Sequence, residues 1–275
     1  MPQSQSDLNA ISDALVAARQ NCKRVDKFPG KLPATLEEAY AVQMMSIEKW
    51  PSPVVGFKVG GIPESFRGQY PAPWQVGPMF KDQMYSVASG ESIHVTVYEG
   101  GFAAYEAEFV FAVTGLDRLT APVETIAEAK SFVTKVYLGA EIASSPNPEV
   151  NNLGPGSIIS DFGNNAGVVV GPEAPLSLLD DISAIEVTLH IDGEEIGRKN
   201  PTDGEGGPLG ALRHILNHFV EHKDALDLPE TVLISSGAIT GVHRSYAGTS
   251  SKIKFGELAE YELSMVPRRP DDLSV

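Results

Sequence analysis

Apolar residues recur along the chain with two different periods, and the period predicts which segments are helices and which are strands. Spacings of three and four residues over 7–21, 36–49 and 208–223 predict three helices. Alternation and short apolar runs predict strands at 54–61, 84–88, 93–98, 105–113, 133–142, 167–171, 184–191, 231–236, 251–255 and 260–266. Two helices therefore come early and one comes late, with most of the strands between them.

This order of elements favours an α+β fold with a mixed or antiparallel sheet closed on itself, because βαβ alternation is missing. Asp192-Gly193 lies between two strand signals and predicts a hairpin. The stretch 62–75 is rich in loop-forming residues and carries three aromatic side chains, which is typical of an ordered surface loop or a lid over a site. We therefore expect residues 1–75 to form an N-terminal helical region and lid, and residues 76–275 to form the domain of the closed sheet.

The composition of the 275-residue chain narrows its possible partners. The net charge is −15 without a cluster of Lys or Arg, which argues against nucleic acid and anionic membrane as partners. No apolar run approaches the ~20 residues that span a bilayer. The single cysteine, Cys22, cannot form an internal disulfide, so we expect a protein of the reducing cytoplasm. A small anionic substrate would need local positive charge, such as a bound metal or a buried lysine.

Two glutamates, Glu106 and Glu108, lie one residue apart in the predicted strand 105–113 and therefore on one face of it. Neighbouring carboxylates repel each other, and a divalent cation that takes oxygen ligands would neutralise them. A third carboxylate, Glu141, follows near the end of another predicted strand. The same alternation is also typical of a half-solvated strand that binds no metal. Spacing alone leaves both interpretations open.

Three other kinds of site are not supported by the sequence: a phosphate-binding loop, a histidine metal site and a serine hydrolase site. The segment 203–207 precedes a helix and is rich in glycine, but it lacks the Lys and Ser/Thr of a phosphate-binding P-loop. His214, His218 and His222 lie on one stripe of a helix but flank its apolar face, so we expect a solvated or interface face rather than a metal site. No Gly-Xaa-Ser-Xaa-Gly motif occurs, which excludes the common serine hydrolase arrangement.

Seven short motifs follow one another over nearly the whole chain, from about residue 10 to 266. They are Leu36–Gln43, Gly56–Gly60, Gly77–Phe80, Glu106–Phe109, Ala140–Ile142, Pro208–Asn217 and Ser236–Thr240. As an ordered set they resemble the hydratase/decarboxylase branch of the fumarylacetoacetate hydrolase superfamily, which includes 2-keto-4-pentenoate hydratases and 4-oxalocrotonate decarboxylases. The resemblance implies the β-roll core of that superfamily, which makes 76–275 a β-roll catalytic domain, with a smaller helical N-terminal part.

The resemblance also implies a metal-dependent site. In it, Mg²⁺ or Mn²⁺ would be bound by Glu106, Glu108 and Glu141. Lys58, in a Gly-Phe-Lys-Val-Gly strand motif, would handle a proton or bind a carboxylate, and a lowered pKa beside the metal would suit acid–base work. Asp161 is the second candidate catalytic residue.

The implied substrate is a small 2-oxo or 2-hydroxydienoate acid, with a role in aromatic catabolism. Hydration of the dienol is the first expectation; the alternatives are a 4-oxalocrotonate-type decarboxylase and a non-catalytic partner subunit. Candidate substrate-binding residues are Arg67, for a distal carboxylate, and Gln75, Asn164 and Gly237. We expect a homo-oligomer, or a complex with a related decarboxylase or hydratase.

Two segments depart from the pattern of this branch. Gln75 stands where the hydratases carry an acidic residue, and the serines of a further motif are replaced in the segment Asp161–Gly167. The resemblance therefore implies metal-dependent chemistry of 2-oxo acids more strongly than it implies hydration.

Overall fold

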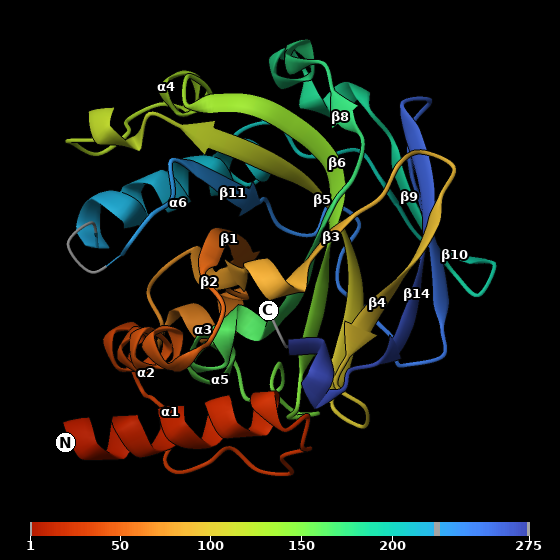
Figure 1. Ribbon diagram of the computed structural model, residues 1–275. Helices are drawn as coiled ribbons and strands as arrows, with labels where there is room; N and C mark the ends of the chain where they lie inside the picture. Colours follow the sequence, from red (N-terminus) through yellow and green to blue (C-terminus); the bar gives the residue numbers. More distant parts are fainter. Residues whose placement is uncertain (1, 223–225, 274–275) are drawn as a thin grey trace.

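Two sheets form the body of the protein in the computed structural model, which describes residues 2–222 and 226–273 (Figure 1). The larger sheet has nine strands, and the order along its main path is β2 (Trp74–Phe80), β1 (Val54–Gly61), β11 (Thr231–Ser235), β5 (Phe102–Thr114), β6 (Val133–Ser145), β7 (Asn165–Val170) and β3 (Met84–Ser86). Two short strands, β12 (His243–Arg244) and β8 (Glu173–Ala174), pair with β5 and β6. The smaller sheet has the order β10 (Glu194–Lys199), β9 (Val187–Ile191), β13 (Ser250–Phe255), β14 (Ala259–Pro267) and β4 (Ser92–Val97).

The helices gather mainly on one side of the molecule, away from the smaller sheet (Figure 1). They are α1 (Gln5–Gln20), α2 (Leu36–Lys49), α3 (Glu64–Arg67), α4 (Ile126–Lys130), α5 (Pro155–Ser160) and α6 (Pro208–His222). Helix α2 packs against α1 and α5, and α6 packs against α4 and β1. Short 3₁₀ turns occupy Lys81–Gln83, Leu116–Arg118, Phe162–Asn164, Leu176–Asp180, Ile182–Ala184 and Pro270–Leu273. No helix within residues 2–222 and 226–273 is both long and apolar enough to cross a membrane.

Strand pairing is mixed, which confirms the α+β fold with a curled sheet and a small helical N-terminal part. Strands β1 and β11 run parallel, as do β3 and β7, while β5 pairs antiparallel with both β11 and β6. Figure 1 shows the long strands β5 and β6 curving through the molecule from the helical side toward the smaller sheet. The ring of Phe109 on β5 lies 6.0 Å from that of Phe255 on β13, so the apolar face of β5 packs against the second sheet.

Local sequence predicted several elements to the residue. The helix 36–49 and the strand 54–61 have the predicted bounds. Asp192-Gly193 joins β9 to β10 with φ of 50° and 86°, as a hairpin turn of this type requires. Residue 223 of the predicted third helix lies outside the described residues. The predicted boundary at residue 75 falls inside β2, and β1 pairs with β11, so one sheet joins both predicted parts.

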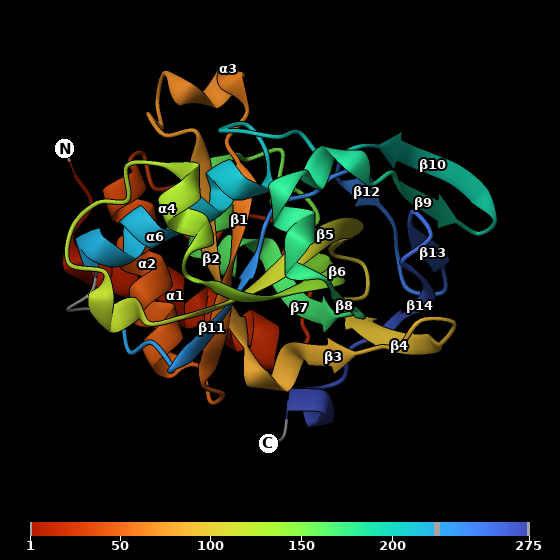
Figure 2. The same cartoon turned by 90° about the horizontal axis from the view of Figure 1, so that it is seen from above.

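The stretch 62–75 is an ordered part of the structure. It contains helix α3, which projects from the body of the molecule (Figure 2). Tyr70 is buried, and its hydroxyl donates a hydrogen bond to the carbonyl of Pro33 over 2.6 Å. This anchor holds the segment against the loop that precedes α2.

Arg19 on α1 is fully buried and connects the first helix to the larger sheet. Its Nε lies 2.5 Å from the Asp161 carboxylate, and its guanidinium donates to the carbonyls of Asn165, Ser144 and Asp161. Burial alone would lower the pKa of Arg19, but the charge and hydrogen bond of Asp161 together with the nearby Tyr98 outweigh burial and raise that pKa. A buried ion pair of this kind destabilises the fold strongly when one partner is removed.

We expect Arg19→Met to lower the free energy of unfolding by about 3–5 kcal/mol, because it leaves a buried carboxylate without its cation. The matched control is Arg24→Met, which removes a half-exposed arginine paired with Asp26 and should cost less than about 1 kcal/mol. Urea unfolding followed by circular dichroism measures both. Equal unfolding midpoints for the two variants would contradict the importance of the buried pair.

Candidate metal centre and pocket

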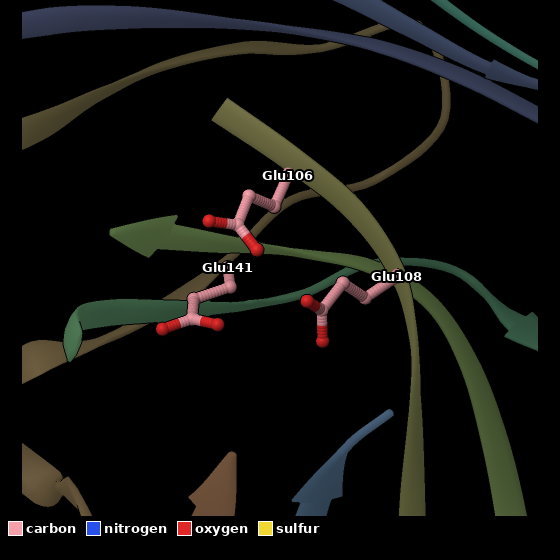
Figure 3. Close-up of side chains that lie close together, drawn as sticks. All are labelled: Glu106, Glu108 and Glu141. Carbon is pink, nitrogen blue, oxygen red and sulfur yellow. The ribbon is translucent and has the colours of Figure 1, made fainter. Parts of the chain in front are cut away.

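Three glutamates converge between β5 and β6. Glu106 and Glu108 project from the same face of β5, and Glu106 is paired in register with Glu141 of β6. One carboxylate oxygen from each lies within 4.8 Å of the others, and Figure 3 shows the three carboxylates pointing toward one another. Their exposed fractions are 5%, 0% and 0%. The half-solvated strand, which spacing alone left open, is therefore wrong: β5 is buried on both faces.

Burial and the charge of a neighbouring carboxylate disfavour ionisation of Glu106 and Glu108. Desolvation, with the charge of Glu141 adding to it, raises the pKa of Glu106 to about 8, although the nearby ammonium of Lys58 opposes the shift. The pKa of Glu108 is raised well above its ordinary value, again by desolvation first and then by Glu141 and Glu106. The three groups can be ionised together when a cation compensates them.

Hydrogen bonds orient two of the carboxylates but do not use all of their oxygen atoms. Glu108 Oε2 accepts from the Ser235 hydroxyl at 2.5 Å and from the backbone amide of Gly237 at 2.9 Å. Glu141 Oε1 accepts from the side-chain amide of Asn165 at 3.0 Å. Within the described part of the chain, Glu108 Oε1 is buried without a hydrogen-bond partner, and Glu141 Oε2 accepts no hydrogen bond but lies 3.3 Å from the Lys58 ammonium. Buried carboxylate oxygens that need a partner fit a hard divalent cation, so the triad can hold a metal.

Lys58 brings a positive charge to the same place. It lies on β1 with 4% of its surface exposed, and its Nζ is 3.3 Å from Glu141 Oε2. Burial alone would lower the pKa of Lys58, but the three glutamates outweigh burial and raise it. The sequence had suggested a lowered pKa beside a metal; the glutamates by themselves have the opposite effect and keep the ammonium charged.

A cavity of about 390 Å³ opens next to the triad. It brings together five of the residues predicted from the sequence, which are Lys58, Gln75, Glu106, Asn164 and Gly237. Glu108 and Glu141 lie behind this lining. The rest of the lining comes from β1, β2 and the loop between them, α5 and the loop before it, the loop after β11 and the segment that joins β10 to α6.

Arg67 and Asp161 are not brought to this cavity. Arg67 belongs to the projecting helix α3, and its Nε donates to the carbonyl of Ile62. Asp161 is held by Arg19, as described above, and its placement gives no support to the predicted catalytic role. The local sequence could not predict the position of either side chain, because each position depends on packing between distant segments.

A strained turn positions Asn164 in the pocket. Phe162, Gly163 and Asn164 have φ of 54°, 65° and 60°, a left-handed conformation that a bulky aromatic residue rarely adopts. The turn packs closely on Gly77, where an added Cβ would lie 2.4 Å from the carbonyl oxygen of Phe162. The amide of Asn164 donates to Asn151 Oδ1 at 2.7 Å, and Asn151, which the sequence did not mark, also lines the cavity.

The three histidines of α6 do not line the cavity, and two of them, His218 and His222, lie beside Tyr40 of α2. The rings of His218 and Tyr40 are 5.2 Å apart, and those of His218 and His222 are stacked at 4.1 Å. Burial lowers the pKa of His214 to about 4 and that of His218 to about 3, so both are neutral. The predicted interface face is therefore a contact within the chain.

In residues 2–222 and 226–273, the glutamate triad is the one cluster of three or more metal-ligating groups.

Comparison with known proteins rests on the fold. No protein-family model matches the chain, and no curated protein matches it significantly. Among solved structures, 4-oxalocrotonate decarboxylase from Pseudomonas putida G7, complexed with magnesium and adipate, is similar with a TM-score of 0.73 at 18% identity. The match covers 96% of this chain and 99% of that one. The same decarboxylase complexed with calcium and acetate has a TM-score of 0.71.

Fumarylpyruvate hydrolase from Pseudomonas aeruginosa, in complex with Mn²⁺ and pyruvate, is similar over 79% of this chain and 91% of that one, with a TM-score of 0.56 at 16% identity. Because these identities are low, the comparisons show a similar fold and do not indicate a particular activity. The protein has the fold of the fumarylacetoacetate hydrolase superfamily, the superfamily that its ordered sequence motifs resemble.

Proposed function

We propose that the protein is a metal-dependent enzyme that acts on a small 2-oxo or 2-hydroxydienoate acid. The observation that carries this proposal is the convergence of three buried glutamates, one of which has a carboxylate oxygen without a partner, beside a buried lysine and a cavity. Mg²⁺ or Mn²⁺ would be bound by Glu106, Glu108 and Glu141, since both ions take oxygen ligands. Similar folds complexed with magnesium and with Mn²⁺ support the choice of ion.

The side chains around the cavity would have different roles in the reaction. When bound, the ion would supply Lewis acidity toward the C2 oxygen of a 2-oxo acid. The charged ammonium of Lys58 faces the same place, where it can hold a carboxylate or give a proton to the substrate carbon. The loop after β11, from Ser236 to Val242, closes one wall, and Trp74 adds an apolar surface that excludes water.

The ionisable groups favour decarboxylation over hydration, which the sequence had placed first. Among the described residues that line the cavity, only Lys58, Glu106 and Lys199 are ionisable. Glu106 is committed to the metal, and the amides of Gln75 and Asn164 cannot take a proton from water. Loss of carbon dioxide needs no base: the breaking C–C bond leaves its electron pair on the conjugated C2 carbonyl, and one proton is then returned to carbon. Lys58 can supply that proton.

Hydration stays the second candidate because of one observation. Gln75 Oε1 and Asn164 Oδ1 are buried acceptors without a hydrogen-bond partner among the described residues. Both residues line the cavity, so the two oxygens can accept hydrogen bonds from a water molecule. Hydrolytic C–C cleavage is less favoured, since the stretch 62–75 contains Glu64 but no histidine to activate water.

We expect Mg²⁺ or Mn²⁺ at about 100 times its dissociation constant to stabilise the wild-type protein by about 2.7 kcal/mol. Glu108→Gln should abolish this gain without lowering the stability of the metal-free protein, because it removes a group that repels its neighbours. Glu99→Gln, on an exposed loop, is the matched control and should keep the gain. Thermal unfolding with and without metal measures both effects. An undiminished gain in Glu108→Gln would show that the metal binds elsewhere.

The stability of the metal-free protein should fall as the pH rises from about 4.5 to 8. The pKa of Glu106 is about 8 in the folded protein and about 4.3 in an unfolded chain, so the folded state holds an extra proton in this range. Metal binds ionised carboxylates, and the stabilisation by Mg²⁺ should therefore grow over the same range. Melting temperatures at about pH 5.5, 7 and 8 with and without Mg²⁺ check this. A metal effect independent of pH would contradict the raised pKa.

The reaction itself is tested by product masses. Wild-type protein with Mg²⁺ or Mn²⁺ should release carbon dioxide from the 2-oxo form of an unsaturated dicarboxylate, whereas gain of one water by a 2-hydroxydienoate would establish hydration instead. Lys58→Met should slow the reaction by at least about 100-fold while it keeps the thermal stabilisation by metal. Lys81→Met, at an exposed position, is the control for lost charge. Metal binding without any turnover of 2-oxo or 2-hydroxydienoate acids would favour a non-catalytic partner subunit.

A further inference from the structure

Two hydrogen-bond donors from one short segment at the end of β11 hold Glu108. The Ser235 hydroxyl and the Gly237 backbone amide both donate to Glu108 Oε2, at 2.5 and 2.9 Å. Glu108 Oε1 is buried and has no hydrogen-bond partner within the described residues. One oxygen of this carboxylate is therefore fixed by the protein, while the other is left for a ligand.

The backbone at Ser235 is itself held in the sheet. Ser235 is the last residue of β11 and is fully buried. It lies opposite Lys58 of β1 on one side and Val110 of β5 on the other. The amide of Ser236 then donates to the carbonyl of Phe109 at 3.1 Å. The Ser235 hydroxyl therefore projects from a backbone that cannot shift without breaking strand pairing.

The second donor depends on a turn that favours glycine. Gly237 has φ of 92°, in the left-handed region, and an added Cβ would lie 3.1 Å from the carbonyl oxygen of Val59. The sequence had suggested Gly237 as a substrate-binding residue. In the structure, its amide hydrogen is used by Glu108. Because this donor is a backbone group, the Ser235 hydroxyl is the donor that a substitution can remove.

Glu141 is held differently. The side-chain amide of Asn165 donates to Glu141 Oε1 at 3.0 Å, and the ammonium of Lys58 lies 3.3 Å from Oε2. Both oxygens of Glu141 therefore face a protein group, whereas Glu108 has one fixed oxygen and one free one. The direction of the free oxygen of Glu108 depends on the donors to Oε2.

This direction matters more for a small cation than for a large one. A glutamate ends in a torsion with broad preferences, so its carboxylate can rotate even when its backbone is rigid. Mg²⁺ requires nearly octahedral geometry with short distances to its ligands, whereas Ca²⁺ accepts longer distances and irregular geometry. A side chain that fixes the carboxylate should therefore affect the two ions unequally.

We propose that Ser235 is a positioning residue of the metal centre: its hydroxyl fixes Glu108 Oε2, directs Oε1 toward the ion, and so supports Mg²⁺ more than Ca²⁺. This inference rests on the proposed function, because it takes Glu106, Glu108 and Glu141 as the metal ligands. It deepens that function by naming a residue that sets ion selectivity without contacting the ion or the substrate.

The test is isothermal titration of the metal-free protein with MgCl₂ and with CaCl₂. Ser235→Ala should weaken Mg²⁺ binding about tenfold or more, as loss of a group that orients a ligand typically does, and Ca²⁺ binding no more than about threefold. Ser235→Thr keeps the hydroxyl and should bind both ions as the wild type does. Circular dichroism and thermal unfolding without metal establish that each variant is folded.

The matched control is Ser236→Ala. Ser236 is the neighbouring serine, it is also buried, and its hydroxyl has no hydrogen-bond partner among the described residues. Its removal should leave the affinities for Mg²⁺ and Ca²⁺ unchanged.

Each other result overturns a defined part of the argument. If Ser235→Ala binds Mg²⁺ as tightly as the wild type, or weakens Mg²⁺ and Ca²⁺ equally, the positioning role is wrong while the triad stands as the metal site. A folded Ser235→Thr that binds Mg²⁺ as weakly as Ser235→Ala would also contradict the role of the hydroxyl. If the wild type binds neither ion, the proposed function fails, and this inference fails with it.

Discussion

The rest of the site depends on three carboxylates buried within a few ångströms of one another. Each is separated from water, and burial together with the charge of Glu141 raises the cost of ionising Glu106 and Glu108, so these two groups must hold protons or face a cation. The pairing of β5 with β6 sets Glu106 opposite Glu141 and keeps them together despite this repulsion. Hydrogen bonds from Ser235 and Gly237 then orient Glu108. The backbone of the sheet therefore holds the carboxylates close together against their repulsion, whereas a flexible loop would move them apart.

The closed shape of the sheet explains how one strand can carry both a core and a site. The face of β5 with Phe109 packs on the smaller sheet, while the face with Glu106 and Glu108 looks toward β1, β11 and the cavity. Neither face of β5 is left to solvent. A carboxylate on such a strand cannot be an ordinary surface group, which is why burial separates the two interpretations that periodicity left open.

The N-terminal helices support the cavity from behind. Arg19 of α1 holds Asp161, which directly precedes the strained turn that carries Asn164. On α2, Tyr40 accepts a hydrogen bond from the backbone amide of Val76 and Gln43 donates one to its carbonyl. Because β2 is an edge strand, these contacts satisfy the backbone groups that no neighbouring strand reaches. They also fix the strand beside Gln75. The helical part and the sheet thus form one supporting framework for the site.

Sequence by itself determined the elements whose conformation is set by near neighbours. The period of apolar residues and the cap at Thr35 gave the helix 36–49, and the strand period placed Glu106 and Glu108 on one face. The ordered motifs added Glu141 and Lys58. What each side chain meets was decided by tertiary structure: Asp161 is paired with a residue 142 positions away, and nothing in the sequence indicates that Ser235 donates to Glu108. The reason is physical, since periodicity reports which face a residue occupies, whereas burial and charge partners depend on distant segments that fold against that face.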